Sequence, residues 1–115
     1  MATSHEVEAF CRAHGGLERL ANHLALCIEE MGTNIVSHGF SKGGKNSLSV
    51  RLQVKEGRWT LRFRDDCREF DPISHVEQNA CESLGIRLAM SMADEARYTY
   101  SMSLNNLTLV LRDVA

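Results

Sequence analysis

The sequence predicts an α+β fold, a two-layer sandwich in which a mixed, mainly antiparallel sheet is covered on one face by about three helices. One observation is a run of apolar residues over 17–35 at the three-and-four spacing of a buried helical face. Glycine pairs at 15–16 and 43–44 bound this run. The other observation is the alternation of apolar and polar residues that is typical of strands, over 48–54, 59–63, 98–102 and 107–111.

Helices are expected at three places along the chain. The first covers residues 5–14 and the third covers about 84–94. The long helix between the glycine pairs should end at Gly39, because glycine fits the position just past a helix C-terminus. Its buried face is predicted to consist of Leu17, Leu20, Ala21, Leu24, Ile28, Met31 and Ile35.

The four strands are expected to form two antiparallel hairpins. Glu56-Gly57 is predicted to turn the first hairpin, and Asn105-Asn106 the second, because both dipeptides are turn formers. The resulting order is helix, helix, strand, strand, helix, strand, strand. One face of the sheet should stay open to water or to a partner.

Composition narrows the class of protein. A chain of 115 residues fits one domain over 1–115, and its net charge of −2 gives no electrostatic footprint for nucleic acid or an anionic membrane surface. The four cysteines form no CxxC pair, so we expect reduced thiols and a cytoplasmic location. The N-terminus has no basic region followed by an apolar run, and no apolar stretch approaches the ~18 residues of a membrane helix.

A first candidate site lies on the long helix. Steps of four put Glu30, Asn34 and His38 on nearly one face, at the edge of the apolar stripe. A carboxylate and an amide one turn apart can hold hydrated Mg²⁺ and orient a water. The same spacing also fits an ordinary solvated helix side. Gly32 favours the functional interpretation, because a glycine inside a helix costs about 1 kcal/mol against alanine and usually indicates close approach of a ligand or backbone.

Two further candidate segments follow the strands. Residues 64–72 (RDDCREFDP) come directly after the second strand, where Asp65 could accept a hydrogen bond from an exocyclic amine. Asp-Asp and Asp-Pro are also simple turn formers. Residues 83–86 (SLGI) enter the third helix, where backbone N–H groups can bind phosphate and a glycine lets it come close. A serine there is equally an ordinary N-cap.

Taken in order, the three segments resemble the sequence boxes of the GHKL ATPase superfamily, and most closely those of anti-sigma-factor serine/threonine kinases. Residues 30–40 (EMGTNIVSHGF) resemble that family's asparagine box, and 64–72 resemble its first glycine box. Leu84 and Gly85 resemble the core of its second glycine box. Residues 92–98 and 106–109 resemble its last helix and closing strands, so the likeness covers roughly residues 7–112.

The resemblance implies a role for each matching residue. Glu30 would be the general base that activates the attacking hydroxyl or water, and Asn34 would hold Mg²⁺ against the phosphates. His38 would be mostly structural, and residues 71–82 would form a lid over ATP. The nucleotide-binding residues would be Asp65 (for the adenine amino group), Cys67, Phe70 (near the adenine pocket), Leu84 and Gly85.

Three residues depart from the family pattern. Cys67 stands where the family has the glycine of its Asp-x-Gly, and Ser83 stands where a glycine usually precedes the Leu-Gly pair. Glu69 brings a negative charge where a small or neutral residue is common. A thiol at Cys67 would crowd the pocket if glycine serves there for close approach of adenine.

Three interpretations therefore stay open. The first is a Mg·ATP-binding regulatory domain that phosphorylates a serine or threonine of a partner, which would be an anti-anti-sigma-like protein, a sigma factor or another domain of a parent chain. The second is a non-catalytic interaction or sensor module that kept the fold and lost nucleotide. The third is an unrelated α+β binding domain. No contact with nucleic acid or membrane is expected, and a homodimer is compatible with the open sheet face.

Overall fold

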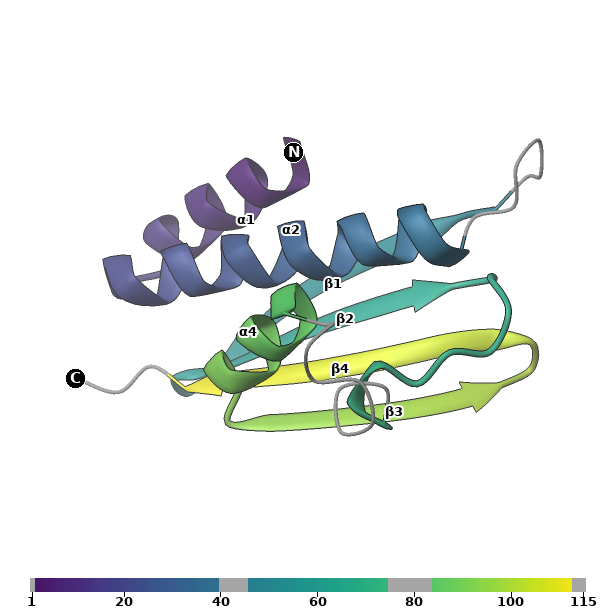
Figure 1. Ribbon diagram of the computed structural model, residues 1–115. Helices are drawn as coiled ribbons and strands as arrows, with labels where there is room; N and C mark the ends of the chain where they lie inside the picture. Colours follow the sequence, from purple (N-terminus) through teal and green to yellow (C-terminus); the bar gives the residue numbers. More distant parts are fainter. Residues whose placement is uncertain (1, 40–45, 75–83, 113–115) are drawn as a thin grey trace.

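The computed structural model describes residues 2–39, 46–74 and 84–112, and it confirms the predicted order of elements (Figure 1). Two helices come first, followed by a β-hairpin, a third described helix and a second hairpin. Their bounds are α1 (Ala2–Ala13), α2 (Glu18–Gly39), β1 (Leu48–Lys55), β2 (Arg58–Asp65), α4 (Leu84–Met92), β3 (Glu95–Ser101) and β4 (Leu104–Arg112).

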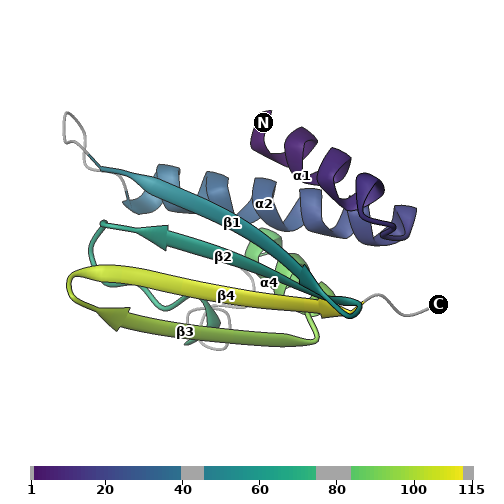
Figure 2. The same ribbon diagram turned by 180° about the vertical axis from the view of Figure 1, so that it is seen from behind.

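The strands form one four-stranded sheet in the order β1-β2-β4-β3. All three described strand pairs are antiparallel, so the expected mixed sheet has no parallel pair in this part of the chain. α2 and α4 lie over one face of the sheet, and α1 packs on α2 (Figures 1 and 2). The predicted α+β two-layer sandwich is confirmed.

The core lies between the helices and the covered face of the sheet. Every second residue of β2 points into the core, as the alternation predicts. The side chains that face the sheet come from α2, whose buried apolar residues recur at the helical spacing. The largest fully buried side chains are those of Trp59, Phe63, Leu24, Ile28, Met31, Leu61, Leu109 and Leu111. α2 is 22 residues long, yet no described helix is both long and apolar enough to cross a membrane.

The first hairpin turns where expected, and the second does not. Glu56 and Gly57 have φ of 50° and 74°, as a tight two-residue turn requires. The second turn lies at Met102 and Ser103, with φ of 52° and 63°, so the prediction of a turn at Asn105-Asn106 is wrong. Asn105 is instead a buried residue of β4, and its hydrogen bonds, described below, explain the difference.

The predicted core face of the long helix is wrong at its first residue. Leu17 is 42% exposed and precedes α2, whose Ala21 N–H donates to the Leu17 carbonyl at 3.0 Å. Leu17 is therefore the capping residue just before α2, so the helical spacing that predicts burial does not yet apply to its side chain. Leu24, one and a half turns into α2, is fully buried.

We predict that Leu24→Ala lowers the free energy of unfolding by about 2–5 kcal/mol, because it leaves a cavity between helix and sheet. Leu17→Ala makes the same chemical change at the exposed cap and should cost less than about 1 kcal/mol. Urea denaturation of both variants measures the difference. Equal losses would contradict the packing described here.

Candidate functional site

Packing of α2 against α4 brings Glu30 and Gly85 together. A Cβ atom at Gly85 would lie 2.1 Å from Glu30 Oε2, closer than atoms approach, and 3.1 Å from Glu30 Cδ, which is a tight contact. Glycine therefore lets the first turn of α4 lie directly against this carboxylate, and a side chain here would push the carboxylate out of its present position. The contact joins two of the predicted segments, which are far apart in the sequence.

The environment of Glu30 is suited to anions. α4 begins at Leu84, so Gly85 belongs to its first turn, where backbone N–H groups lack partners within the helix. The helix dipole is positive at this end and favours negative charge. Glu30 and Asn34 are both half-buried on α2, and Asn34 follows Glu30 by one turn.

The Asp65 carboxylate ends β2 and faces the core, only 6% exposed. Its Oδ1 atom accepts the Cys67 N–H at 3.0 Å and a proton of Asn105 Nδ2 at 2.9 Å. A buried carboxylate needs such donors, because desolvation without them is costly. Asp65 is therefore held in one orientation by the loop that follows it and by the neighbouring strand.

Asn105 is the residue that holds this loop together. Its Nδ2 also donates to the carbonyls of Cys67 at 3.1 Å and Arg68 at 3.0 Å. Its Oδ1 accepts the Phe70 N–H at 3.0 Å and the Tyr98 hydroxyl proton. The sequence reasoning missed this role, although Asn105 continues the inward alternation of Leu107, Leu109 and Leu111 once the turn is set at 102–103.

The Cys67 thiol lies beside this carboxylate. Burial raises the pKa of Cys67 to about 12, and a hydrogen bond to Asp65 and the charges of Asp65 and Asp66 act in the same direction. The thiol therefore stays protonated near neutral pH. Burial also raises the pKa of Tyr98, which keeps its hydroxyl available as a donor to Asn105.

Two other carboxylates of the segment act locally. Asp66 Oδ1 accepts the Ser47 N–H at 2.9 Å, and this bond lowers the pKa of Asp66. Asp71 Oδ1 accepts the N–H groups of Ile73 at 2.9 Å and Ser74 at 3.3 Å, as an N-cap of the helical turn that starts at Pro72. For these two residues, the turn-forming interpretation explains the contacts.

The predicted site residues thus fall into two groups on the helix-covered side of the sheet. Glu30 meets Gly85 between α2 and α4. At the end of β2, Asp65 accepts the Cys67 N–H and is linked through Asn105 to the backbone N–H of Phe70. Phe70 itself packs half-buried against the core. The side chains of His38 and Leu84, residue Ser83, and lid residues 75–82 lie outside the described part of the chain.

The fold is thus an antiparallel sheet covered by helices on one face, an α+β two-layer sandwich, and the two groups of residues lie on the covered face. A family model described as a histidine kinase-like ATPase domain matches residues 2–111, and the chain belongs to this family. Among characterised proteins, it is similar to the serine/threonine-protein kinase BtrW of Bordetella bronchiseptica. The two are 28% identical over 99 residues, which cover 79% of this chain and 70% of the relative.

Solved structures share the fold. The histidine kinase domain of the blue-light activated histidine kinase EL346 from Erythrobacter litoralis superimposes with a TM-score of 0.64 and 19% identity over 81% of this chain. The Acinetobacter baumannii histidine kinase AdeS gives a TM-score of 0.62 and 11% identity over 83% of the chain. The chain spans 44% and 48% of these two structures.

We predict that Asn105→Ala lowers the free energy of unfolding by about 2–4 kcal/mol, because it leaves several buried polar groups without partners. Asn106→Ala is the matched control. Asn106 is the next residue on the opposite face, where it binds Arg64 Nε at 2.9 Å, and its loss should cost less than about 1 kcal/mol. Chemical denaturation compares the two. A smaller loss at Asn105 than at Asn106 would contradict the proposed importance of the buried amide.

Proposed function

We propose that this domain binds Mg·ATP on the helix-covered side of the sheet and transfers the γ-phosphoryl group to a serine or threonine of a partner protein. The contact between Glu30 and Gly85 carries the proposal. It sets a carboxylate beside a helix N-terminus, which combines a candidate base with a site suited to phosphates. Membership of the histidine kinase-like ATPase family and the likeness to a serine/threonine-protein kinase support it.

At the adenine end, Asp65 accepts the exocyclic amino group of the base. Two donors already hold its carboxylate in a fixed orientation, so binding requires little rearrangement. The same buried carboxylate disfavours the carbonyl that guanine has at this ring position, because two acceptors would then face each other. Phe70 packs near the adenine pocket, and its backbone is held by Asn105.

At the phosphate end, the residues present fit a magnesium-bound triphosphate. Asn34 would hold Mg²⁺ through its amide oxygen, a ligand type that Mg²⁺ accepts together with phosphates and water. Bound Mg²⁺ supplies neutralisation of phosphate charge. The first turn of α4 receives the phosphates, where Gly85 and Leu84 offer backbone N–H groups.

Glu30 performs the proton transfer. It takes the proton of the attacking serine or threonine hydroxyl while the hydroxyl oxygen bonds to the γ-phosphorus. The bond from that phosphorus to the bridging oxygen breaks, and ADP leaves with the electron pair. Candidate partners are an anti-anti-sigma-like protein, a sigma factor or another domain of a parent chain.

A second function, that of an interaction or sensor module without nucleotide, is favoured by one observation. The Cys67 thiol is buried, and its pKa is raised by burial and by Asp65, the carboxylate that the adenine amino group would need. The protonated thiol thus competes with the base for this carboxylate. Glu69, exposed in the same loop, adds negative charge to this region.

We predict that ATP with Mg²⁺ raises the melting temperature of the parent chain and that Asp65→Asn abolishes this rise. A ligand at one hundred times its dissociation constant stabilises a protein by about 2.7 kcal/mol, which is several degrees for a domain of this size. A thermal-shift titration with ATP and GTP measures the effect. Asp66→Asn is the control, because it neutralises the adjacent, exposed carboxylate and should leave the ATP shift intact.

Equal ATP shifts in the parent and in Asp65→Asn would remove Asp65 from the site. A parent that does not respond to millimolar ATP would contradict the nucleotide proposal. If Cys67→Gly then responds to ATP, the thiol is what prevents nucleotide binding in the parent chain. The function of the parent would then be that of the module without nucleotide.

We predict that Glu30→Gln binds ATP within about threefold of the parent but loses at least about a hundredfold in turnover, because the amide cannot accept a proton. ADP release measured with and without candidate partner proteins gives the turnover. Glu29→Gln is the matched control on the adjacent, exposed position and should keep the parent rate. Unchanged turnover in Glu30→Gln would exclude Glu30 as the base.

A further inference from the structure

The face of the sheet that is turned away from the helices is strongly basic, although the chain has a net charge of −2. Figure 2 views the sheet from this side, with the helices behind it. We call it the outer face. Among the outward-facing residues of its four strands there is a single carboxylate, Glu95. The same strands carry seven of the chain's 13 lysines and arginines, all exposed: Arg51, Lys55, Arg58, Arg62, Arg64, Arg97 and Arg112.

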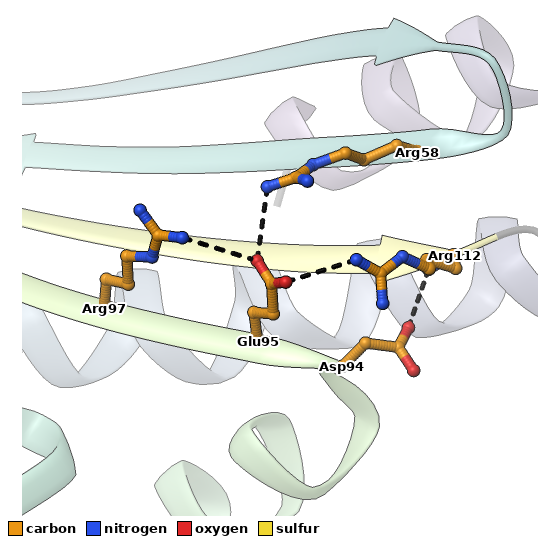
Figure 3. A network of polar contacts seen from close by, with 5 residues as sticks. All are labelled: Arg58, Asp94, Glu95, Arg97 and Arg112. Atoms are coloured by element: carbon orange, nitrogen blue, oxygen red, sulfur yellow. Dashed lines mark hydrogen bonds and ion pairs between the residues drawn. The ribbon is translucent and has the colours of Figure 1, made fainter.

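At one end of the outer face, arginines from three strands converge on Glu95 (Figure 3). Arg58 on β2 and Arg112 on β4 each reach a carboxylate oxygen of Glu95 at 3.2 Å, and Arg97 on β3 approaches at 3.9 Å. The strand spacing thus allows several guanidinium groups to bind one carboxylate. Glu95 therefore shows, within the chain itself, how arginines of the outer face bind a carboxylate.

Towards the other end, two arginines face each other with no described carboxylate between them. Arg51 and Arg62 are directly opposite across β1 and β2, and Arg64 lies two residues further along. Within the described ranges, Arg51 and Arg62 have no carboxylate beside them on the outer face and form no ion pair. Like charges directly opposite in a sheet are destabilising, so fold stability does not account for this pair. A bound anion would relieve the repulsion.

The spacing of these arginines matches an extended protein segment. Arg58, Arg62 and Arg64 point to the same side of β2, at even residue spacings and therefore at multiples of about 6.8 Å. Alternate side chains of an extended partner chain recur at that same distance. The guanidinium group also binds carboxylates through two parallel N–H bonds, which favours glutamate and aspartate as its partners.

Two other occupants fit less well. Sheet surfaces that bind single-stranded nucleic acid use aromatic side chains on which the bases stack, and no aromatic residue lies on the outer face of the described strands. A second copy of the chain packed face to face would bring arginine against arginine. The homodimer through the open sheet face that the sequence allowed is therefore disfavoured by charge.

We propose that the outer face is a docking surface for an acidic, extended segment of a partner protein, with Arg51, Arg62 and Arg64 at its centre. Carboxylates of the segment neutralise the facing arginines as Glu95 does at the other end. The proposal rests on the charge of the sheet alone, so it holds whether or not the chain binds nucleotide.

The test uses a fluorescent peptide of alternating glutamate and serine, followed by anisotropy at low and high salt. The parent should bind it, and Arg51→Gln/Arg62→Gln should weaken binding about tenfold. Arg12→Gln/Arg19→Gln removes the same charge from the helical side and should change affinity less than about twofold. No peptide binding by the parent, or equal losses in both double variants, would overturn the proposal.

Two competing polyanions are measured beside the peptide. A thymidine oligonucleotide of matched charge and vesicles containing phosphatidylserine should bind more weakly than the peptide. Tighter binding of either one, lost in Arg51→Gln/Arg62→Gln, would assign the outer face to nucleic acid or membrane and overturn the proposal.

A measurement without any ligand tests the facing arginines themselves. Arg62→Gln should raise the melting temperature, because it removes a repulsive pair. Arg19→Gln, which removes the same charge from α2, should leave it nearly unchanged. A lower melting temperature in Arg62→Gln than in Arg19→Gln would mean that the pair serves the fold, and the proposal would fail.

Discussion

The buried side-chain amide of Asn105 is the interaction on which the candidate site depends. It binds Asp65, the carbonyls of the loop after β2, and the N–H of Phe70. Leaving such groups buried without partners would cost about 1–3 kcal/mol each. This cost is enough to offset the strain of left-handed backbone at Met102 and Ser103, about 1–2 kcal/mol per residue, and so to set the turn of the second hairpin.

One sheet thereby presents two different surfaces. The covered face is apolar along its length and ends in the fixed carboxylate of Asp65, while packing of α2 on α4 sets Glu30 against Gly85. The outer face carries arginines that none of the described helices covers. A regulatory domain that takes nucleotide on one face and an acidic protein segment on the other would use both surfaces of the same strands.

Periodicity predicted the elements well, because the burial of helix and strand faces leaves a repeating pattern in the sequence. It was wrong where tertiary contacts outweigh local preference. Asn105-Asn106 is a good turn sequence, but the hydrogen bonds of Asn105 to Asp65 exist only in the folded sheet. Leu17 fits the helical spacing yet lies at the cap. The contact of Glu30 with Gly85 joins distant segments, so sequence spacing could not predict it. The family resemblance assigned a role to each of the two residues but did not predict that they meet.

In the proposed function, the group around Asp65 and the group of Glu30 and Gly85 form a single nucleotide site. A ¹⁵N-resolved NMR titration with Mg·ATP tests it most directly, by following the side-chain amide of Asn105 and the backbone N–H of Gly85. For a single site, both signals should move together and fit a single dissociation constant. Signals that stay fixed up to millimolar ATP, or that respond with different affinities, would contradict it.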